Sequence, residues 1–413
     1  MTSTSTPIAK CQICSSASLD SILFLGFIPP VNTMPPVGCK PTEQPAYPLE
    51  LLRCADCGLV QIGLAVSPEV LFPESYPYLS GTTRILRTNF ADLFEECRSM
   101  LDLDKNRLVV DIGSNDGTLL SNFHHHGFPV LGIEPSQAGD VANGKGIRTV
   151  KSYFSVDAAR KLKSEYGAAQ VVTATNVFAH IGDVHAVVQG IIEMLGPRGV
   201  FISESHYLLD LVETVQYDTI YHEHLRYYAA GSIQGLLETH GLEIFHIKRI
   251  PTHGGSIRVY AGRKGERPIE PSVAERLVDE ESKGIADGAA LHTFRGRVIQ
   301  SKLNLYELIA PLKRQGARIY GIGAPSRAST LINYVGLDDG LVDAVMEVSG
   351  SHKLNKYVPG TRIPVLDEAM LYRDQPEFAL FLSWHIADEL AVNLRKNGFK
   401  GKFIAPLPEP RII

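Results

Sequence analysis

Hydrophobic and polar residues alternate with strand and helix periods in turn over residues 108–262. Residues 108–134 predict a strand, a glycine-rich turn, a helix and a second strand, which is the opening unit of a doubly wound sheet. Further strands are predicted at residues 149–155, 170–181, 199–206, 243–250 and 254–262, with helices from residue 156 and through residues 187–195. The last two strands are separated by a short turn and predict an antiparallel hairpin. The pattern therefore predicts an α/β domain over residues 81–290.

The last third of the chain repeats this order on a smaller scale. A predicted helix precedes a strand, a glycine turn and a second helix in residues 317–334. The apolar residues at helical spacing in the first helix are Val298, Leu303, Tyr306, Ile309 and Leu312. Later strands are predicted in residues 341–349, 378–384 and 402–407. These elements predict a small parallel sheet and a second, Rossmann-like domain over residues 291–413.

The first 80 residues show little periodicity, because seven prolines between residues 29 and 48 interrupt regular elements. An aromatic loop with Tyr76 and Tyr78 follows, and it is either a hydrophobic plug or a substrate contact. Apolar residues at helical spacing from Ile85 to Phe94 then predict a linking helix. We therefore expect an α/β protein with three domains, a small lobe at 1–80 preceding the two larger ones.

The composition is that of an ordinary globular protein. The 413 residues are 44% hydrophobic and 21% charged, and no run approaches the ~18 apolar residues of a membrane span. The net charge is -5 and the basic residues are scattered. The sequence therefore has no basic cluster that could release counterions from a nucleic acid, and a nucleic-acid partner is not expected. The first ten residues lack the order of a secretory signal. We expect a cytoplasmic monomer with no membrane or nucleic-acid partner.

Four of the six cysteines form two pairs with the same spacing, Cys11 and Cys14, and Cys54 and Cys57. Thiolates two residues apart on a tight turn point the same way, and two such turns supply the four sulfur ligands that zinc prefers. The alternatives are two disulfides, which a reducing compartment disfavours, and two unrelated buried pairs. A site with four sulfur ligands leaves no position for a reactive water, so we expect this zinc to be structural.

The first glycine turn of the α/β domain favours S-adenosylmethionine (SAM) over a dinucleotide. Asp111, Gly113 and Gly117 make Asp-x-Gly-x-x-x-Gly, whereas a dinucleotide fold has Gly-x-Gly-x-x-Gly. The pattern resembles the first motif of class I SAM-dependent methyltransferases. Glu134 ends the next strand, where a carboxylate can accept from both hydroxyls of a ribose. The alternatives are a turn cap for Asp111 and a solvated loop acid for Glu134.

More polar residues follow the next two predicted strands. Asn176 and His180 lie at the end of one, and Glu204 and His206 at the end of the other. Ligands of open α/β sheets bind beyond these carboxyl ends, so all four residues are candidates for the pocket. Each of them alone could also be a helix cap or a hydrogen-bonded buried group.

An insertion at residues 207–233 concentrates ionisable and aromatic side chains. They are Tyr217, Asp218, Tyr221, His222, Glu223, His224, Tyr227 and Tyr228. A metal site through His222 and His224 lacks a third spaced ligand nearby. A proton-abstracting base is more attractive, because imidazole titrates near neutral pH and a neighbouring tyrosine hydroxyl can donate to an oxyanion.

Taken together, these motifs resemble those of the nucleotide-sugar C-methyltransferases, which methylate C-3 of 4-keto-6-deoxy sugar nucleotides. The likeness covers the whole chain and is carried by the paired CxxC motifs, VDIGSNDGTLL, YDTIYHEH, HGGSIRVY and GIGAPSRASTLINY. It implies a zinc-binding lobe, a SAM-binding middle domain and a Rossmann-like C-terminal domain, with a TDP- or GDP-linked sugar held between the last two. It also implies that Tyr76, Tyr221, Glu223 and His224 are active-site residues and that His224 is the base.

The C-terminal domain departs from the pattern of this family in two places. Pro325-Ser326-Arg327 replaces the usual lysine and small residues of the glycine turn, and His385 follows Trp384. Arg327 is a candidate ligand of the substrate diphosphate, and Tyr357 lies in a loop expected near the ligand. Two other functions are a nicotinamide-dependent sugar oxidoreductase and a zinc-ribbon RNA-binding protein. Thermal stabilisation by SAM without stabilisation by NAD(H) would exclude the first, and salt-dependent RNA binding would favour the second.

Overall fold

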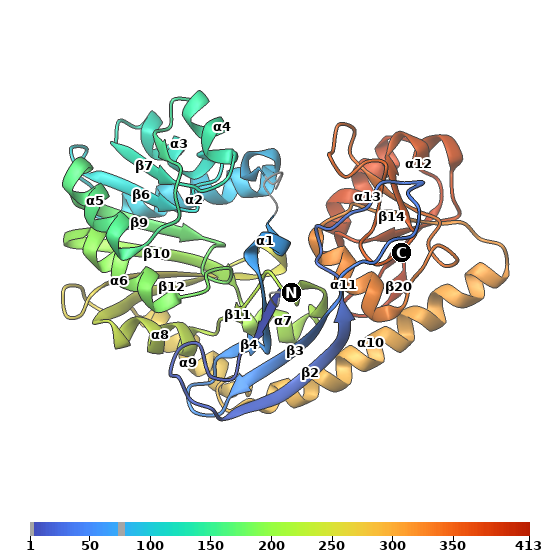
Figure 1. The fold of residues 1–413 in the computed structure, drawn as a ribbon, viewed down its shortest axis with the longest axis horizontal. Coiled ribbons are helices and arrows are strands. Elements are labelled where there is room, and N and C mark those ends of the chain that lie inside the picture. Colours follow the sequence, from blue (N-terminus) through green and yellow to red (C-terminus); the bar gives the residue numbers. More distant parts are fainter. Residues whose placement is uncertain (1–3, 73–78) are drawn as a thin grey trace.

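The computed structural model describes residues 4–72 and 79–413, so the predicted active-site residue Tyr76 and its neighbour Tyr78 lie outside the described residues. Two α/β lobes stand side by side, and a smaller N-terminal sheet lies along their base in the view of Figure 1. The described residues form two seven-stranded sheets, one four-stranded sheet and one two-stranded ribbon. In this part of the chain, no helix is both long enough and apolar enough to cross a membrane.

The left-hand lobe of Figure 1 contains the sheet β12-β13-β10-β9-β6-β7-β8. Its strands are β6 (Leu108–Ile112), β7 (Val130–Ile133), β8 (Thr149–Val150), β9 (Ala169–Thr175), β10 (Leu195–His206), β12 (Leu242–Ile250) and β13 (Ser256–Arg263). Strands β6 to β10 are parallel, and β13 is antiparallel to both β10 and β12. The predicted doubly wound sheet with a closing hairpin is confirmed.

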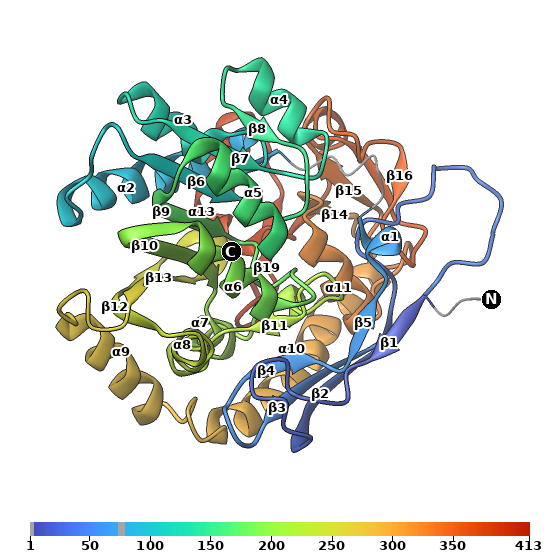
Figure 2. The same ribbon diagram turned by 60° about the vertical axis from the view of Figure 1, so that its left-hand side comes forward.

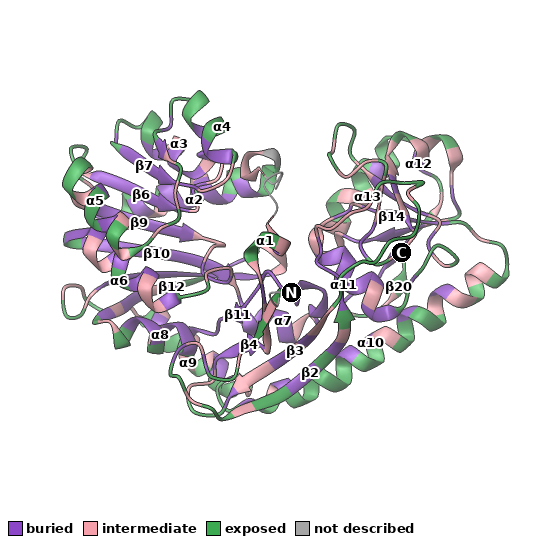
Figure 3. Cartoon of the chain, viewed as in Figure 1, coloured by how far each residue is buried: buried purple, intermediate pink, exposed green. Residues whose placement is uncertain are grey.

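Helices cover both faces of this sheet, and the burial pattern in Figure 3 shows buried strands under helices with exposed outer faces. They are α2 (Arg84–Met100), α3 (Thr118–His125), α4 (Ala138–Gly144), α5 (Val156–Tyr166), α6 (Val184–Met194), α8 (Ala230–Thr239) and α9 (Pro271–Ser282). Helix α2 buries Phe90 and Leu93 in the core, whereas Ile85 is exposed. Strand β9 ends before the predicted residue 181, because Asn176 has a left-handed φ of 57° that no strand accommodates.

The right-hand lobe contains the second seven-stranded sheet, in the order β16-β17-β15-β14-β18-β19-β20. The strands are β14 (Ile319–Ile322), β15 (Ala344–Glu347), β16 (Lys356–Tyr357), β17 (Pro364–Asp367), β18 (Phe378–Phe381), β19 (Lys402–Ala405) and β20 (Arg411–Ile412). The helices are α11 (Ser326–Val335), α12 (Ala369–Asp374) and α13 (Ala387–Lys396), with a 3-10 turn at Trp384–Ile386. The predicted second Rossmann-like unit is confirmed; β16, β17 and β20 were not predicted, because runs of two to four residues carry no clear period.

Helix α10 (Ala289–Arg314) connects the lobes along the base, where it packs against α11 and β2 (Figures 1 and 2). It buries Val298, Leu305 and Ile309, at the spacing of one helix face. The predicted positions Leu303 and Tyr306 are instead 48% and 45% exposed. Leu303 is five residues from Val298 and therefore lies about 140° around the helix from it.

The N-terminal sheet is completed by the insertion of the middle domain. Its order is β11-β4-β3-β2, with β2 (Leu19–Ile28), β3 (Tyr47–Cys54), β4 (Val60–Ile62) and β11 (Arg226–Tyr227). The two-stranded ribbon is β1 (Ser5–Pro7) with β5 (Leu64–Val66), and the helix α1 (Pro68–Leu71) follows it. The prolines interrupt the lobe less than predicted, since Pro48 lies within β3. The lobe thus shares its sheet with the segment that follows His224.

A buried carboxylate joins the carboxyl edges of the two large sheets. Asp218 lies in a 3-10 turn of the insertion (Tyr217–Thr219) and is fully buried. Arg327, at the start of α11, donates to its two oxygens over 2.7 and 2.8 Å, and Trp384 Nε1 donates over 2.8 Å. Both donors follow strands of the C-terminal sheet, so this contact fixes the two lobes edge to edge.

A second buried ion pair ties β10 to β13. Arg258 Nε donates to Glu204 over 2.6 Å, and Asn89 of α2 donates to the other Glu204 oxygen over 2.9 Å. We expect Glu204→Ala to lower the free energy of unfolding by about 3 kcal/mol, because it removes one partner of a buried pair and leaves Arg258 only its second ion pair, with Glu96. Urea denaturation would measure the change.

Glu95→Ala is the matched control for this prediction. Glu95 forms an exposed ion pair with Arg98 on the surface of α2, so its loss should change stability by no more than about 0.5 kcal/mol. Equal denaturation midpoints for the two variants would contradict the structural role of Glu204.

Candidate active site

The four cysteines predicted to bind zinc converge in the N-terminal lobe. The thiols of Cys11, Cys14, Cys54 and Cys57 all lie within 4.8 Å of one another. Two of the sulfur pairs are 3.4 and 3.5 Å apart, and a tetrahedral zinc with bonds of about 2.3 Å requires sulfur separations near 3.8 Å. All four are free cysteines, so the disulfide alternative is wrong. The set fits a closed, structural Zn²⁺ site.

The predicted SAM residues gather where β6, β7 and β9 end side by side. Gly113 and Gly117 have φ values of 68° and 75°, in the left-handed region that favours glycine. A Cβ atom on Gly113 would also lie 2.5 Å from a methyl group of Val177. The turn therefore packs closely against the loop after β9, which leaves no room for a side chain at Gly113.

Two carboxylates and an amide face the same edge. Glu134 accepts hydrogen bonds from the backbone of Asn115 and Ser136 over 3.0 and 2.9 Å, which fixes its carboxylate at the tip of β7. Burial raises the pKa of Asp111 to about 7, although Thr173 donates to it over 2.6 Å. The buried Oδ1 of Asn176 has no hydrogen-bond partner among the described residues. An orphaned acceptor of this kind fits a bound ligand with N–H or O–H groups.

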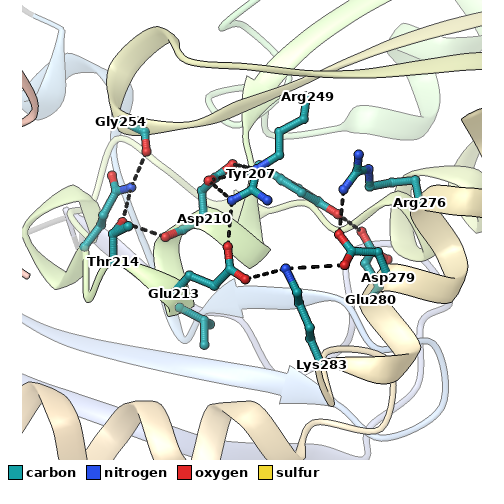
Figure 4. A network of polar contacts seen from close by, with 12 residues as sticks. Tyr207, Asp210, Glu213, Thr214, Arg249, Gly254, Arg276, Asp279, Glu280 and Lys283 are labelled. Atoms are coloured by element: carbon teal, nitrogen blue, oxygen red, sulfur yellow. Dashed lines mark hydrogen bonds and ion pairs between the residues drawn. The ribbon is translucent and has the colours of Figure 1, made fainter.

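The insertion is held in place by a polar network between α7 (Leu208–Glu213), β12 and α9 (Figure 4). Arg249 of β12 donates to Asp210 and, over 2.6 Å, to Glu213 of α7. Lys283, just after α9, extends the network to Glu213 over 2.5 Å. The hydroxyl of Tyr207 donates to the buried carboxylate of Glu280 over 2.8 Å. These contacts fix the start of the insertion, and the predicted catalytic residues follow directly.

Four histidine rings lie in a row at the carboxyl edge of β9 and β10. His224 lies between His180 and His206, with ring centroids 4.9 Å from each, and His206 is 5.5 Å from His253. They come from the loop after β9, the end of β10, the insertion and the turn between β12 and β13. The sequence had indicated the first three, and the structure brings them together.

The environment of His224 suits a neutral base. Its Nδ1 lies 2.9 Å from the carbonyl of Thr219, which can only accept, so Nδ1 carries the hydrogen and Nε2 is the acceptor of the ring. Burial and the neighbouring His180 lower the pKa of His224 well below its usual value. Burial also lowers the pKa values of His180 and His253 to about 4. The row is therefore neutral at pH 7.

His222 faces away from this row. Its Nε2 lies 3.4 Å from the carbonyl of Pro48, and its ring packs against Tyr47 of the N-terminal lobe. His222 and His224 therefore point to different elements. In the described part of the chain, the four cysteines are the one group of three or more ligands close enough to share a metal.

The other predicted catalytic residues adjoin His224. The ring of Tyr221 lies 4.1 Å from the ring of His224. Glu223 is buried and accepts a hydrogen bond from Asn32 of the N-terminal lobe over 2.6 Å. Asn32 in turn accepts from Ser326, at the start of α11, over 3.3 Å. Glu223 thus lies where all three predicted domains meet.

Three of the predicted substrate residues have other partners in the structure. Glu204 is buried in its pair with Arg258, and the guanidinium of Arg327 is paired with Asp218. A diphosphate could therefore reach Arg327 only by competing with that carboxylate. The hydroxyl of Tyr357 accepts from the backbone of Gly38 over 3.2 Å, so Tyr357 contacts the N-terminal lobe.

An open pocket of about 480 Å³ lies between the two α/β lobes. Its walls include the turn residues Gly254 and Gly255 on one side and Trp384 and His385 on the other. Arg249 and Asp210 contribute charged groups. The pocket is large enough for part of a nucleotide-sized ligand and is bounded by both α/β lobes.

Several residues of the site had no assigned role in the sequence. His253 precedes two glycines in the turn of the predicted hairpin. That turn lies at the carboxyl edge of the sheet, so the hairpin prediction could have indicated His253 as a site residue. Asp218 lies in the insertion, but its partners Arg327 and Trp384 are more than 100 residues away. Asn32 lies in the proline-rich segment, where no local pattern indicates a contact with Glu223.

Three family patterns match the chain and together span most of it. A zinc binding domain matches residues 11–72, a methyltransferase domain matches residues 82–247, and a C-methyltransferase C-terminal domain matches residues 251–408. The chain is also 31% identical over 412 residues to the C-methyltransferase NovU of Streptomyces niveus, covering 98% of this chain and 97% of the relative.

Solved structures resemble a smaller part of the chain. A SAM-dependent methyltransferase from Anabaena variabilis is 18% identical, with a TM-score of 0.34, over 43% of this chain and 86% of its own. Magnesium protoporphyrin IX methyltransferase from Synechocystis, solved with SAM bound, is 15% identical, with a TM-score of 0.34, over 43% of this chain and 79% of its own.

The full-length relative and the three matched domains agree with the geometry described above. The cysteine cluster corresponds to the matched zinc binding domain, and the glycine turn at Gly113 lies in the matched methyltransferase domain. The chain therefore belongs to the C-methyltransferase family and is a SAM-dependent methyltransferase with a structural zinc site.

Proposed function

We propose that this enzyme methylates C-3 of a nucleotide-linked 4-keto-6-deoxy sugar. The observation that carries the proposal is the neutral imidazole of His224, whose Nε2 accepts at the edge where the predicted SAM residues converge. A carbon atom becomes a methyl acceptor when an adjacent ketone allows a base to remove its proton. Methylation of an oxygen atom would not require this enolate. The motif resemblance over the whole chain supports a sugar nucleotide as the substrate.

In this proposal, the chain's own residues perform the proton transfer. His224 removes the C-3 proton through Nε2, while its Nδ1–H remains bonded to Thr219. Tyr221, beside it, donates to the oxyanion that develops at O-4, a role that Tyr76 shares by resemblance. Glu223, which accepts a hydrogen bond from Asn32, either accepts from a sugar hydroxyl or orients the histidine. Bound SAM supplies the methyl group that the enolate attacks.

The remaining site residues are proposed for binding. Glu134 would hold the ribose of SAM, and Asp111 and Asn176 its amino-acid end, next to the turn at Gly113 and Gly117. We propose His180, His206 and Arg327 as contacts of the sugar or the diphosphate. The division into domains at about residues 80 and 290 and the monomeric, cytoplasmic state stay predictions.

The substrate class is tested with a panel of TDP-, GDP- and CDP-linked 4-keto-6-deoxy sugars and SAM. We expect mass spectrometry to detect one added methyl group on at least one of them, and NMR to place it on C-3. The matching 4-hydroxy sugar nucleotide is the control and should not react, because it cannot form the enolate. Methylation of an oxygen atom, or of the 4-hydroxy control, would contradict the proposal.

His224→Asn should reduce exchange of the C-3 proton into deuterated water by about 10²–10⁴-fold, the usual contribution of a general base. The exchange is followed by NMR without methyl transfer, and SAM binding should be unchanged. His222→Asn is the matched control, since His222 faces Pro48 and should be dispensable for exchange. Exchange at the wild-type rate in His224→Asn would remove His224 from the role of base.

The pH profile should show the depressed pKa of the base. Activity requires neutral His224, and burial shifts its pKa downward, so the neutral form persists below the ordinary value of about 6.5. We therefore expect kcat/KM to be constant from about pH 6.5 to 8 and to fall only at more acidic pH. An acid limb with its midpoint at or above 6.5 would show that the free enzyme has a different base.

A further inference from the structure

Within the part of the chain that the structure describes, Arg226 is a buried cation with no acidic partner. The residue is 1% exposed, and among residues 4–72 and 79–413 no carboxylate lies within 4.0 Å of its guanidinium. The acceptors are instead neutral: the carbonyls of Phe178 (3.1 Å) and Ile181, the hydroxyl of Tyr228 (3.0 Å) and the side-chain oxygen of Gln12. A buried charge is costly unless its hydrogen bonds are satisfied, so these groups are held in a defined geometry around the guanidinium.

Apart from Gln12, the acceptors of Arg226 belong to the two segments that carry His180 and His224. Phe178 and Ile181 flank His180 in the loop after β9. Arg226 itself follows His224 by two residues, and the amide of Leu225 donates to the carbonyl of Ala179 over 2.8 Å. The spacing between His180 and His224, whose ring centroids are 4.9 Å apart, is therefore set by these bonds.

Gln12 connects this cluster to the zinc site, because it lies between the ligands Cys11 and Cys14. Its side-chain oxygen accepts from Arg226, and its Nε2 donates to the carbonyl of Leu225 over 3.4 Å. The backbone amide of Gln12 donates to Gln61 of β4 over 2.9 Å, and β4 pairs with β11. A metal that fixes the turn at Cys11–Cys14 thereby fixes the side chain that Arg226 binds.

We propose that the zinc turn positions the active site, with Gln12 and Arg226 as positioning residues that set the separation of His180 and His224. The zinc then does more than hold a small lobe together: it orders the loop after β9 and the end of the insertion. This inference rests on the proposed role of His224. Neither Gln12 nor Arg226 needs to contact the substrate, so their loss acts on the geometry of the histidines.

The first test is Gln12→Ala, which removes the acceptor of Arg226 and leaves all four cysteines in place. We expect one zinc per chain by elemental analysis, an unchanged Kd for SAM, and a kcat lowered about tenfold or more with little change in KM, since small displacements of catalytic groups act mainly on the chemical step. Gln44→Ala, at an exposed position of the same lobe, is the matched control and should behave as wild type.

Two further variants separate positioning from general damage. Gln12→Glu retains an oxygen acceptor for Arg226 but loses the Nε2 donor to Leu225, so it should restore part of kcat. Arg226→Lys leaves the zinc turn untouched but cannot reproduce the planar set of donors, so it should lower kcat as Gln12→Ala does. If the Gln12→Ala protein loses its zinc, the kcat of Arg226→Lys alone tests the proposal. A wild-type kcat in the zinc-loaded Gln12→Ala protein or in Arg226→Lys, or no rescue by Gln12→Glu, would overturn the proposal.

Hydrogen–deuterium exchange gives a measure that needs no substrate. In Gln12→Ala, and in wild type after zinc removal by a chelator, amides of residues 178–182 and 221–228 should exchange faster, while those of β6 and β7 stay protected. Unchanged exchange in both segments would overturn the coupling. If wild type methylates no sugar nucleotide, the proposed function fails, and the exchange data still decide whether zinc orders these segments.

Discussion

The carboxylate of Asp218 is the contact on which the arrangement of the large domains depends. It is fully buried and accepts from Arg327 and Trp384, which follow two strands of the C-terminal sheet. Because both large sheets present their carboxyl edges to this point, the ligand-binding ends of two α/β units face one another. The pocket of about 480 Å³ lies along this junction, bounded by Trp384 and His385 on one side and the turn at Gly254 on the other.

The insertion after β10 contacts the N-terminal lobe, the C-terminal domain and the rest of its own domain. Its first helix is fixed by the ion network around Arg249 (Figure 4), and its 3-10 turn carries Asp218. Arg226 and Tyr227, later in the insertion, form β11 and complete the sheet of the N-terminal lobe. Tyr221, Glu223 and His224 lie between these anchors. A segment without a long helix or strand is thus held in place because its contacts reach two different sheets.

Burial dominates the electrostatics of the site. Four imidazoles lie side by side, and burial lowers the pKa values of all four. Neighbouring imidazoles lower the pKa values of His206 and His224 further. Asp111 shows the opposite response for the same reason, since burial disfavours its charged form and raises its pKa to about 7. The four imidazoles are therefore neutral at pH 7, and the charge of a bound cationic sulfonium would act strongly on this buried part of the site.

The sequence by itself determined the elements and the local motifs. The strand and helix periods located both large sheets, the CxxC spacing predicted the sulfur cluster, and the glycine turn with Glu134 indicated SAM, because each of these signals is contained in a few consecutive residues. Periodicity missed the two-residue strands β16 and β20, which are too short to show a period. It also placed Leu303 on the buried face of α10, whereas this side chain is exposed. Only the tertiary structure decided that Arg327 pairs with Asp218, that Glu204 is buried against Arg258, and that Asn32 and Gln12 reach the insertion. Those contacts join residues 54 to 214 positions apart, and no local pattern records which distant groups a folded chain brings within hydrogen-bonding distance.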